Sequence, residues 1–404
     1  MKVAMVTIYP SRKAAGEAMG GVAAFAAALA ENLAGSLDTQ MLILAQKSDG
    51  REEESANGVR VRRIWSHGGA FILPVIKEIR RARPDLVHLQ HEVFLYGGIL
   101  SALKFPALLA LLRMSGQKTI VTIHGVPDPN DIDKEFTGIG GLHVPSLFVK
   151  IVFKGLFRLI ARLSRGQIVH DESFRRIMIE GYGAEPSRVT TIPLPYLSDQ
   201  PSLVPKEEAR TALGIGEGPV ALLFGYISKY KGVELLIDGF RLFAKTHPDS
   251  LLIIAGGLHP RLKEDAEYLS YYNRLKARAD EALGKNVIWK GFVPEDEIDL
   301  IFSAIDLCVL PYVKMLSFSG PAMLAMARGV PLMVSEAMAP LFSDDCPVFE
   351  ASPQALSVQL RRFFDEDNDK PANLLVLDEF QPGTIAKRTR DFYEAVLRET
   401  TATP

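Results

Sequence analysis

Cysteine is scarce in this chain: only two of its 404 residues are cysteine, Cys308 and Cys346. Two cysteines exclude a disulfide framework, and neither of them belongs to a CxxC pair. Cys308 stands inside the apolar run Leu307–Leu310, which is typical of a small core residue. No group of His, Cys, Asp and Glu has the spacing of a metal site, so we expect no obligatory metal ion and no bound cofactor.

Long apolar runs are missing as well. No stretch reaches the roughly 18 uncharged apolar residues that a transmembrane helix needs. The apolar run within Met1–Pro10 is short and lacks a small-residue cleavage site, so it predicts a first strand and not a signal peptide. Together with the scarcity of cysteine, these features favour a cytoplasmic protein.

The charges of the chain nearly balance. A net charge of −2, from 46 Lys and Arg against 48 Asp and Glu, argues against a nucleic-acid-binding protein. The balance hides an asymmetry, because residues 1–195 hold 24 basic and 18 acidic side chains, which gives +6 there and −8 in the remainder. The two halves therefore favour different partners. The GxSxG and GxxxxGK[ST] signatures are absent, and no GxGxxG follows the first predicted strand.

The length of the chain predicts two domains. Short apolar runs typical of buried parallel strands alternate with helical patterns, first in residues 1–195 and again in 196–384. These runs are Val3–Ile8, Gln40–Leu44, Leu86–Leu89, Thr119–Ile123, Gln167–Val169 and Val189–Ile192, then Val220–Phe224, Leu251–Ile254, Val287–Lys290, Leu307–Leu310 and Pro331–Val334. We therefore predict an α/β fold of two facing Rossmann-like domains, each with a parallel sheet and helices on both faces, and a cleft between them. The polar stretch before Lys206 is the expected linker. A last helix is expected near 385–404, and its sequence is compatible with packing on either domain.

Two turns in the first half follow predicted strands. The segment Gly20-Gly21-Val22 precedes the helix Ala23–Leu33, where glycines allow close approach of a ligand and the helix N-terminus offers N–H groups to a phosphate. A tight turn without a ligand explains these glycines equally well. His124 follows the strand Thr119–Ile123, and its place at the carboxyl end of a strand favours a binding residue over a core residue.

Two further turns lie in the second half. The strand Val220–Phe224 leads through Gly225 and Tyr226 to Lys231, just before a predicted helix. A cation at a helix start is suited to hold a diphosphate and to stabilise it as it leaves, although a solvated lysine explains the position equally well. The segment Ser317-Phe318-Ser319-Gly320 repeats the pattern of a small-residue turn before an apolar helix. Two such turns in one domain favour a diphosphate ligand.

In their order along the chain these segments resemble the retaining group-1 glycosyltransferases of GT-B fold (glycosyltransferase family 4). The resemblance runs over nearly the whole chain. It rests on Gly20-Gly21-Val22, Thr122–Gly125, Lys231-Gly232-Val233, Gly291–Pro294 and Ala325–Pro331. The segment Gln90-His91-Glu92, with Tyr96-Gly97-Gly98 after it, is similar to a sub-branch of the family that also has a Ser-Gly loop like Ser319-Gly320.

The resemblance implies roles for the matching residues. His124 would hydrogen-bond the donor sugar or its transition state, and Lys231 would stabilise the leaving diphosphate. Phe292 and Val293 would flank the nucleobase. The implied donor site consists of Gly20, Gly21, Val22, Gly225, Tyr226, Lys229, Phe292, Val293, Ser317, Phe318, Ser319 and Gly320, and the implied acceptor site of Gln90, His91 and Glu92. Such enzymes retain the anomeric configuration, with the leaving phosphate taking the acceptor proton.

The chain departs from the family pattern at charged positions. Leu316 and Leu324 stand where the family commonly has two glutamates, the second of which binds the donor ribose. Tyr226 stands where a phosphate-binding arginine is usual. Losing such a charge costs roughly 2–4 kcal/mol of transition-state stabilisation unless Lys229 substitutes for it.

Three functions remain open at this stage. The first is an active retaining glycosyltransferase that moves a sugar from a nucleotide-diphosphate-sugar donor to a cytoplasmic glycan or lipid-linked acceptor. The second is a binding or scaffolding protein with the same fold and a degenerate donor site. The third is a nucleotide-sugar epimerase, which would convert the donor with no acceptor present.

Residues 144–166 form an apolar stretch that contains no acidic side chain. Its basic residues recur at steps of four, which on a helix makes one basic stripe: Lys150, Lys154, Arg158 and Arg162, followed by Arg165. The pattern is typical of an interfacial helix drawn to anionic lipid or to a lipid-diphosphate acceptor, and it implies a peripheral position on the inner face of the cell membrane. A helix packed within the domain, with a basic solvated edge, explains the pattern as well.

Overall fold

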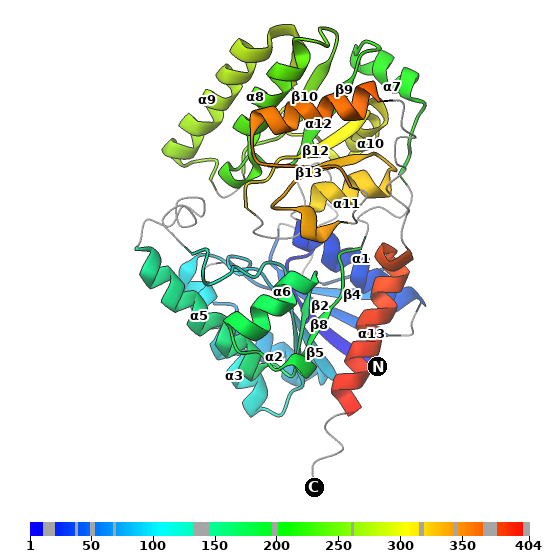
Figure 1. Cartoon of the computed structure of the whole chain (residues 1–404). Coiled ribbons are helices and arrows are strands. Elements are labelled where there is room, and N and C mark those ends of the chain that lie inside the picture. Colours follow the sequence, from blue (N-terminus) through cyan, green and yellow to red (C-terminus); the bar gives the residue numbers. More distant parts are fainter. Residues whose placement is uncertain are drawn as a thin grey trace. The chain divides into compact units, whose positions relative to one another are not determined.

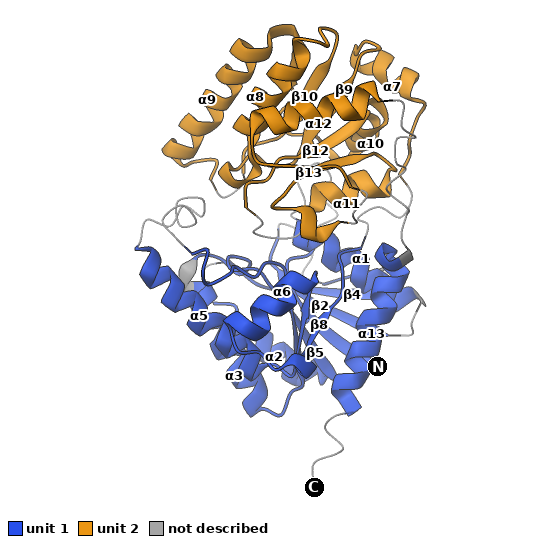
Figure 2. Ribbon diagram, viewed as in Figure 1, with its two compact units in different colours: residues 1–197, 316–318, 378–404 blue, residues 198–315, 319–377 orange. Residues whose placement is uncertain are grey.

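The chain folds into two compact α/β units (Figure 2). The structure is a computed structural model that describes residues 1–10, 21–36, 39–48, 53–67, 70–132, 145–195, 201–259, 262–314, 319–342, 346–366 and 378–398. Unit 1 consists of Met1–Leu197 and the C-terminal segment from Asp378, and unit 2 contains most of the chain between them. The predicted α/β class, with two units built on mainly parallel sheets, is confirmed.

Unit 1 is built on an eight-stranded sheet of order β3-β4-β2-β1-β5-β6-β7-β8. Its strands are β1 (Lys2–Val6), β2 (Gln40–Gln46), β3 (Glu53–Ala56), β4 (Val59–Trp65), β5 (Leu86–His91), β6 (Thr119–Ile123), β7 (Gly166–Val169) and β8 (Val189–Thr191). All neighbouring strands are parallel except the β3–β4 pair. The central strands are buried along their whole length, as expected for a parallel sheet covered on both faces.

Helices cover both faces of this sheet (Figure 1). They are α1 (Gly21–Ser36), α2 (Ile72–Ala82), α3 (Ile99–Met114), α5 (Ser146–Leu163), α6 (Glu172–Arg176) with a π-helical turn at Ile177–Gly181, and α13 (Pro382–Arg398). The last helix, α13, packs beside α1 and shares one apolar core with it and the sheet. The C-terminal helix therefore belongs to unit 1 although it follows unit 2 in the sequence.

Unit 2 has a six-stranded, all-parallel sheet of order β11-β10-β9-β12-β13-β14. Its strands are β9 (Val220–Phe224), β10 (Leu251–Ala255), β11 (Val287–Trp289), β12 (Leu307–Leu310), β13 (Leu332–Ser335) and β14 (Val348–Phe349). Its helices are α7 (Lys206–Leu213), α8 (Val233–Ala244), α9 (Ala266–Leu283), α10 (Glu295–Ala304), α11 (Gly320–Ala327) and α12 (Pro353–Asp365). The strand order reverses between β9 and β12, and ligands bind at the carboxyl ends of the strands at such switch points.

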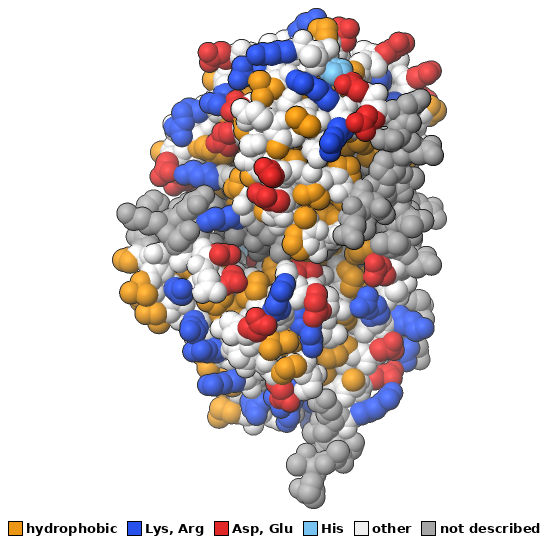
Figure 3. Space-filling view, in the orientation of Figure 1, with side chains coloured by type: hydrophobic (Ala, Val, Ile, Leu, Met, Phe, Trp, Pro, Cys, Tyr) orange, Lys and Arg blue, Asp and Glu red, His pale blue; other side chains and the backbone are white. Residues whose placement is uncertain are grey.

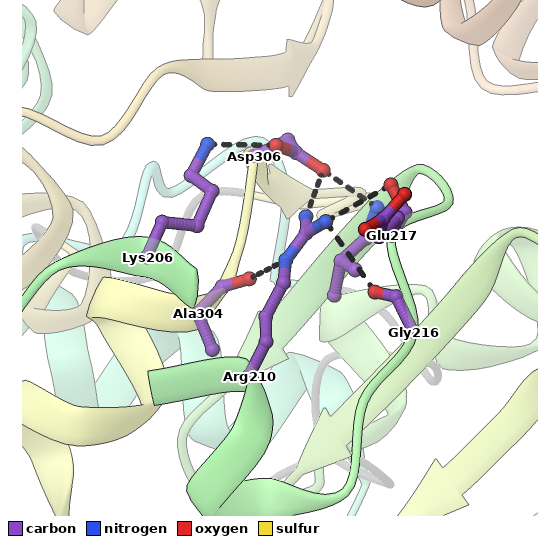
Figure 4. Close-up of polar contacts among 7 residues, drawn as sticks. Lys206, Arg210, Gly216, Glu217, Ala304 and Asp306 are labelled. Carbon is purple, nitrogen blue, oxygen red and sulfur yellow. Dashed lines mark hydrogen bonds and ion pairs between the residues drawn. The ribbon is translucent and has the colours of Figure 1, made fainter. Parts of the chain in front are cut away.

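An ion-pair cluster around Asp306 attaches the first helix of unit 2 to its sheet (Figure 4). The Asp306 carboxylate accepts hydrogen bonds from Lys206 Nζ at 2.8 Å, Arg210 Nη2 at 2.7 Å and the Val220 backbone N at 2.8 Å. The Arg210 guanidinium also donates to the Ala304 carbonyl at 2.9 Å. The cluster therefore joins α7 to the starts of β9 and β12.

Candidate functional site

The first group of candidate residues lies where β9 and β12 end in unit 2. Gly225 follows β9 with φ +102°, and a Cβ atom there would lie 2.9 Å from Lys231 Nζ and 3.1 Å from Pro321 Cγ. The backbone conformation therefore favours glycine at this position, and a larger residue would also displace the end of the Lys231 side chain. The same contacts bring together the β9 loop, the single 3₁₀ turn Lys229–Lys231 and the start of α11.

Lys231 is a buried lysine at this point. Its side chain is 6% exposed, and Nζ lies 5.6 Å from the centre of the Tyr312 ring. Within the described part of the chain, Nζ makes no hydrogen bond or ion pair. Burial lowers the pKa of Lys231 from 10.5 to about 8. A buried ammonium without an anion is costly, so this geometry suits a negatively charged ligand.

The N-terminus of α11 lies beside Lys231. Ser319 is the N-cap residue, and its buried Oγ accepts a hydrogen bond from the Ala322 backbone N at 3.3 Å and lies 3.3 Å from Tyr312 Oη. Gly320 is the first helical residue, where the helix dipole and free N–H groups favour an anion. Ser317 and Phe318, two other predicted donor residues, lie outside the described residues, as does Leu316.

The two residues predicted to flank the nucleobase, Phe292 and Val293, both follow β11 in unit 2. Phe292 follows β11, is 45% exposed and has its Cβ 3.0 Å from where a Cβ of Gly257 would lie. Val293 beside it is buried. Tyr226 follows β9, with its ring 5.8 Å from that of His259. Aromatic surface is thus available at this edge of the sheet, and the assignment to a base stays a prediction.

Lys229 has a partner of its own. Its Nζ forms an ion pair with Glu267 Oε1 at 2.9 Å and lies 5.9 Å from the centre of the Tyr271 ring. A phosphate at Lys229 would have to compete with this carboxylate. Lys229 would therefore bind a phosphate less strongly than a cation without an ion pair. Its expected role in place of the missing arginine stays a prediction.

The second group of candidate residues ends the central strands of unit 1. Side chains alternate between the two faces of a strand, so His88 and Gln90 of β5 share the face of α1 and α13, whereas His91 faces α3 and α5. His124, directly after β6, is buried on the first of these faces. Its Nε2 lies 2.8 Å from Gln90 Oε1, and its Nδ1 lies 3.1 Å from His170 Nε2.

Burial keeps these histidines neutral. It lowers the pKa of His88 and His91 to about 3 and that of His170 to about 4. Burial and the neighbouring rings hold the pKa of His124 well below its ordinary value. Since both ring nitrogens of His124 are engaged inside the protein, it hydrogen-bonds a donor sugar only by exchanging one of these bonds.

Three members of this cluster were not predicted from the sequence. His88 looked like part of an apolar strand. His170 follows β7 as His124 follows β6, and this repeated position was a usable signal. Tyr393, whose Oη lies 2.5 Å from His88 Nδ1, comes from α13 and carried no sequence signal at all.

The predicted acceptor residues have unequal exposure. Gln90 and His91 are buried, whereas Glu92 is exposed. Among the described residues, neither ring nitrogen of His91 has a hydrogen-bond partner. The ring centre lies 4.7 Å from that of Phe105 and 5.7 Å from that of Phe157. Their contact with an acceptor stays a prediction.

The remaining predicted residues occupy the start of α1. Gly21 is the first residue of α1, Val22 is buried, and Gly20 lies outside the described residues. Among the residues that the structure describes, no three His, Cys, Asp or Glu side chains come together as a metal site. Independence from metals and cofactors stays a prediction.

Both halves of the chain match models of known protein families. Residues 19–196 match the family model described as Glycosyltransferase Family 4, and residues 205–341 match that of Glycosyl transferases group 1. Mannosylfructose-phosphate synthase of Agrobacterium fabrum (strain C58 / ATCC 33970) is 32% identical over 165 residues. That match covers 39% of this chain and 35% of the relative, so it spans about a third of the length of that enzyme.

Solved structures share the fold over the whole chain. Sucrose-phosphate synthase from Thermosynechococcus elongatus superimposes with a TM-score of 0.69 at 16% identity, covering 99% of this chain and 97% of that one. The Anabaena protein HepE, solved in complex with UDP, gives a TM-score of 0.70 at 16% identity, covering 98% and 100%. The two family models and the shared fold agree with each other, and this chain belongs to the group-1 glycosyltransferases of GT-B fold.

Proposed function

We propose that the protein is a retaining glycosyltransferase that moves a sugar from a nucleotide-diphosphate-sugar donor, held mainly by unit 2, to a hydroxyl group of a glycan or lipid-linked acceptor. The observation that carries this proposal is Lys231, a buried cation with no ion pair in the described part of the chain, next to the N-terminus of α11. A diphosphate would supply the negative charge that this point lacks. The complex of the structural neighbour HepE with UDP supports a ligand of this class.

The proposed reaction breaks the bond between the anomeric carbon and the diphosphate and forms a bond from that carbon to the acceptor oxygen on the same face. The acceptor proton passes to the leaving phosphate oxygen. Lys231 and the N–H groups at the start of α11 stabilise the charge that develops on the diphosphate. The positive charge comes from the chain itself, so the proposal requires no metal ion and no cofactor.

The proposed lipid-linked acceptor is suggested by the surface of α5. Large apolar side chains on this helix are exposed, among them Leu147 at 68%, Phe148 at 59% and Ile151 at 62%. Lysine and arginine side chains lie among them along the left edge of unit 1 in Figure 3. Two other apolar residues of the same helix, Phe157 and Ile160, are buried in the core. The helix is therefore packed in the domain and also has a basic, apolar outer surface.

We extend the proposal to a peripheral membrane protein whose α5 contacts an anionic bilayer on the cytoplasmic side, where a lipid-linked acceptor is available. No helix in the described part of the chain has the length and hydropathy to cross a bilayer.

Sedimentation with vesicles tests the membrane contact. Vesicles of anionic and zwitterionic lipid are compared for the wild type and for a double variant with Arg158→Glu and Arg162→Glu, both exposed on α5. A matched control changes Arg274→Glu and Lys276→Glu, which are exposed on α9 of unit 2. Binding to anionic vesicles should be lost only in the α5 variant. Equal losses in both double variants would show unspecific charge attraction and end this part of the proposal.

A binding protein with a degenerate donor site is the second candidate. Leu324 on α11 is half-buried and apolar, and its carbonyl accepts a hydrogen bond from Arg328 Nη1 at 3.1 Å. It offers no side-chain acceptor to a ribose. This single feature favours the alternative, whereas the buried charge of Lys231 favours an occupied site.

Ligand-dependent thermal stability separates the two. The protein is melted with UDP, GDP, ADP and their common sugar conjugates, because a ligand at 100 times its Kd adds about 2.7 kcal/mol to the free energy of unfolding. One stabilising nucleotide names the donor class, and a transferase assay with and without added acceptor then distinguishes transfer from epimerisation. No shift at millimolar nucleotide, with lipid present, would refute the donor site and leave the binding-protein reading.

A further inference from the structure

A continuous chain of polar side chains runs through the core of unit 1. It starts at the Ile192 carbonyl, 3.0 Å from His170 Nδ1, and continues from His170 Nε2 to His124 Nδ1 at 3.1 Å. Gln90 joins His124 to His88, and the chain ends where Tyr393 Oη lies 2.5 Å from His88 Nδ1. Five buried side chains are thus linked, from β5, from the residues that follow β6 and β7, and from α13.

The protons in this chain can be assigned from its fixed end. The Ile192 carbonyl only accepts hydrogen bonds, so His170 must carry its proton on Nδ1. A neutral His170 then has a lone pair on Nε2, which obliges His124 to donate from Nδ1. The pKa values of both rings are lowered by burial, which supports the neutral forms.

The same reasoning extends to the other end. His124 Nε2 is left with a lone pair, so the Gln90 group 2.8 Å away must be its NH₂, and the Gln90 oxygen turns to His88 Nε2. A half-turn of the amide exchanges these two atoms, and hydrogen-bond partners decide between the two orientations. His88 Nε2–H also has Thr122 Oγ1 at 2.7 Å, and Tyr393 donates to His88 Nδ1. Every link then has one donor and one acceptor.

The opposite direction fails at the carbonyl. If His124 donated from Nε2, its Nδ1 would need a proton from His170 Nε2. His170 would then place a lone pair against the Ile192 oxygen, or it would carry a second proton in a buried site. With all rings neutral, donors and acceptors can therefore follow each other in only one order along the network. The proton on His170 Nδ1 fixes that order.

We propose that His170 is a positioning residue for His124. Because His170 donates from Nδ1 to the Ile192 carbonyl, its Nε2 accepts from His124 and holds His124 in the Nδ1–H tautomer. Gln90, His88 and Tyr393 of α13 complete the hydrogen-bonded network. In this tautomer Nε2 can only accept, so a ligand hydroxyl that replaces the Gln90 amide there must donate. The catalytic consequence rests on the proposed transferase function, whereas the tautomer itself does not.

Nitrogen-15 NMR of the whole protein, labelled at its eight histidines, reads the tautomers without any substrate. The His124 signals are assigned as those lost in His124→Asn. We expect Nδ1–H for His124 and His170 and Nε2–H for His88. A wild-type His124 protonated on Nε2 at neutral pH would overturn the proposal.

Two substitutions of His170 separate positioning from packing. His170→Phe keeps a ring beside Phe25, whose centre lies 5.4 Å from that of His170, but it cannot accept a hydrogen bond. His170→Gln has an amide oxygen with enough reach to accept from His124 Nδ1. We expect the Nδ1–H tautomer of His124 to persist in the Gln variant and to be lost in the Phe variant. Tyr393→Phe, at the far end, should change the His88 signals and leave those of His124 unchanged.

Activity gives the second measurement. Losing one fixed hydrogen bond should lower kcat of His170→Phe about tenfold, with the donor KM nearly unchanged, while His170→Gln keeps most of the rate. Unchanged kcat in a His170→Phe protein whose His124 tautomer has switched would refute the positioning role. If the wild type turns over no donor, the proposed function fails, and the NMR result still decides whether His170 sets the tautomer.

Discussion

Replacing Lys231 by methionine should change stability and ligand binding in opposite directions. Methionine keeps most of the unbranched stem but removes the ammonium from its buried position near Tyr312. Burial lowers the pKa of Lys231 from 10.5 to about 8. At about 1.4 kcal/mol per pKa unit, keeping the lysine charged costs the free protein about 3 kcal/mol. Lys231→Met should therefore raise the free energy of unfolding at neutral pH by up to that amount.

The same substitution should weaken nucleotide binding. Removing a cation that contacts a diphosphate costs roughly 2–4 kcal/mol, which corresponds to a 30- to 1,000-fold rise in Kd. The nucleoside without phosphates should bind both proteins equally, because the base site is predicted at Phe292 after β11, whereas Lys231 lies in the turn after β9. Urea denaturation of the free proteins and calorimetric titration with the diphosphate and its nucleoside give both quantities.

The pH dependence provides an internal check on Lys231. The unfolded chain holds this proton up to about pH 10.5 and the folded protein only up to about 8, so between these values the unfolded state binds more protons. The stability that Lys231→Met gains over the wild type should therefore shrink as the pH rises through this window, and the affinity of the wild type for a diphosphate should fall. In Lys231→Met this fall in affinity should disappear. A variant that is less stable than the wild type, with unchanged diphosphate affinity and pH trends, would show that Lys231 is a structural residue.

Two further substitutions test features of each unit. His91→Phe should raise the free energy of unfolding by about 1 kcal/mol, because it keeps a ring between aromatic neighbours and removes two buried nitrogens that have no partner in the part of the chain that the structure describes. A lower melting temperature would show that the ring nitrogens are solvated or bonded in solution, and a loss of transfer with intact stability would assign His91 to the acceptor. Asp306→Asn should lower the free energy of unfolding by about 2 kcal/mol, since Lys206 and Arg210 lose their shared carboxylate. A change below about 0.5 kcal/mol in urea denaturation would mean that the cluster is screened as a surface pair.

Strand prediction succeeded for the apolar strands of both sheets and missed β3, β4 and β14. Runs such as Leu86–Leu89 and Val220–Phe224 are apolar throughout because helices cover both sides of each sheet. The β3–β4 hairpin was missed because β4 alternates buried and partly exposed residues, with three arginines in its sequence. Asn57-Gly58, with φ values of 52° and 77°, is a strong hairpin-turn signal that would have revealed it.

Candidate residues were predicted from their places after strands or just before helices. Gly225 and His124 were found because the carboxyl ends of parallel strands form one edge of a sheet. Tyr393 could not be found in this way, since 305 residues separate it from His88 and only the return of α13 to unit 1 brings them together. The sequence predicted one basic stripe along residues 144–166, but side chains four residues apart rotate gradually around a helix of 3.6 residues per turn. Lys150 is accordingly half-buried while Arg158 is exposed.

The departures from the family pattern and the geometry of the donor side favour different conclusions, and the geometry is the stronger argument. Leu324 and Tyr226 remove polar contacts at no cost to folding. Lys231 has the opposite effect, because a charge in this position destabilises the free protein by about 3 kcal/mol, which one substitution would relieve. Gly225 adds a conformational requirement, since residues other than glycine rarely adopt its φ of +102°. Costs of this kind are typical of sites that bind a ligand, because binding offsets them. The balance therefore favours an occupied, working donor site over a degenerate one.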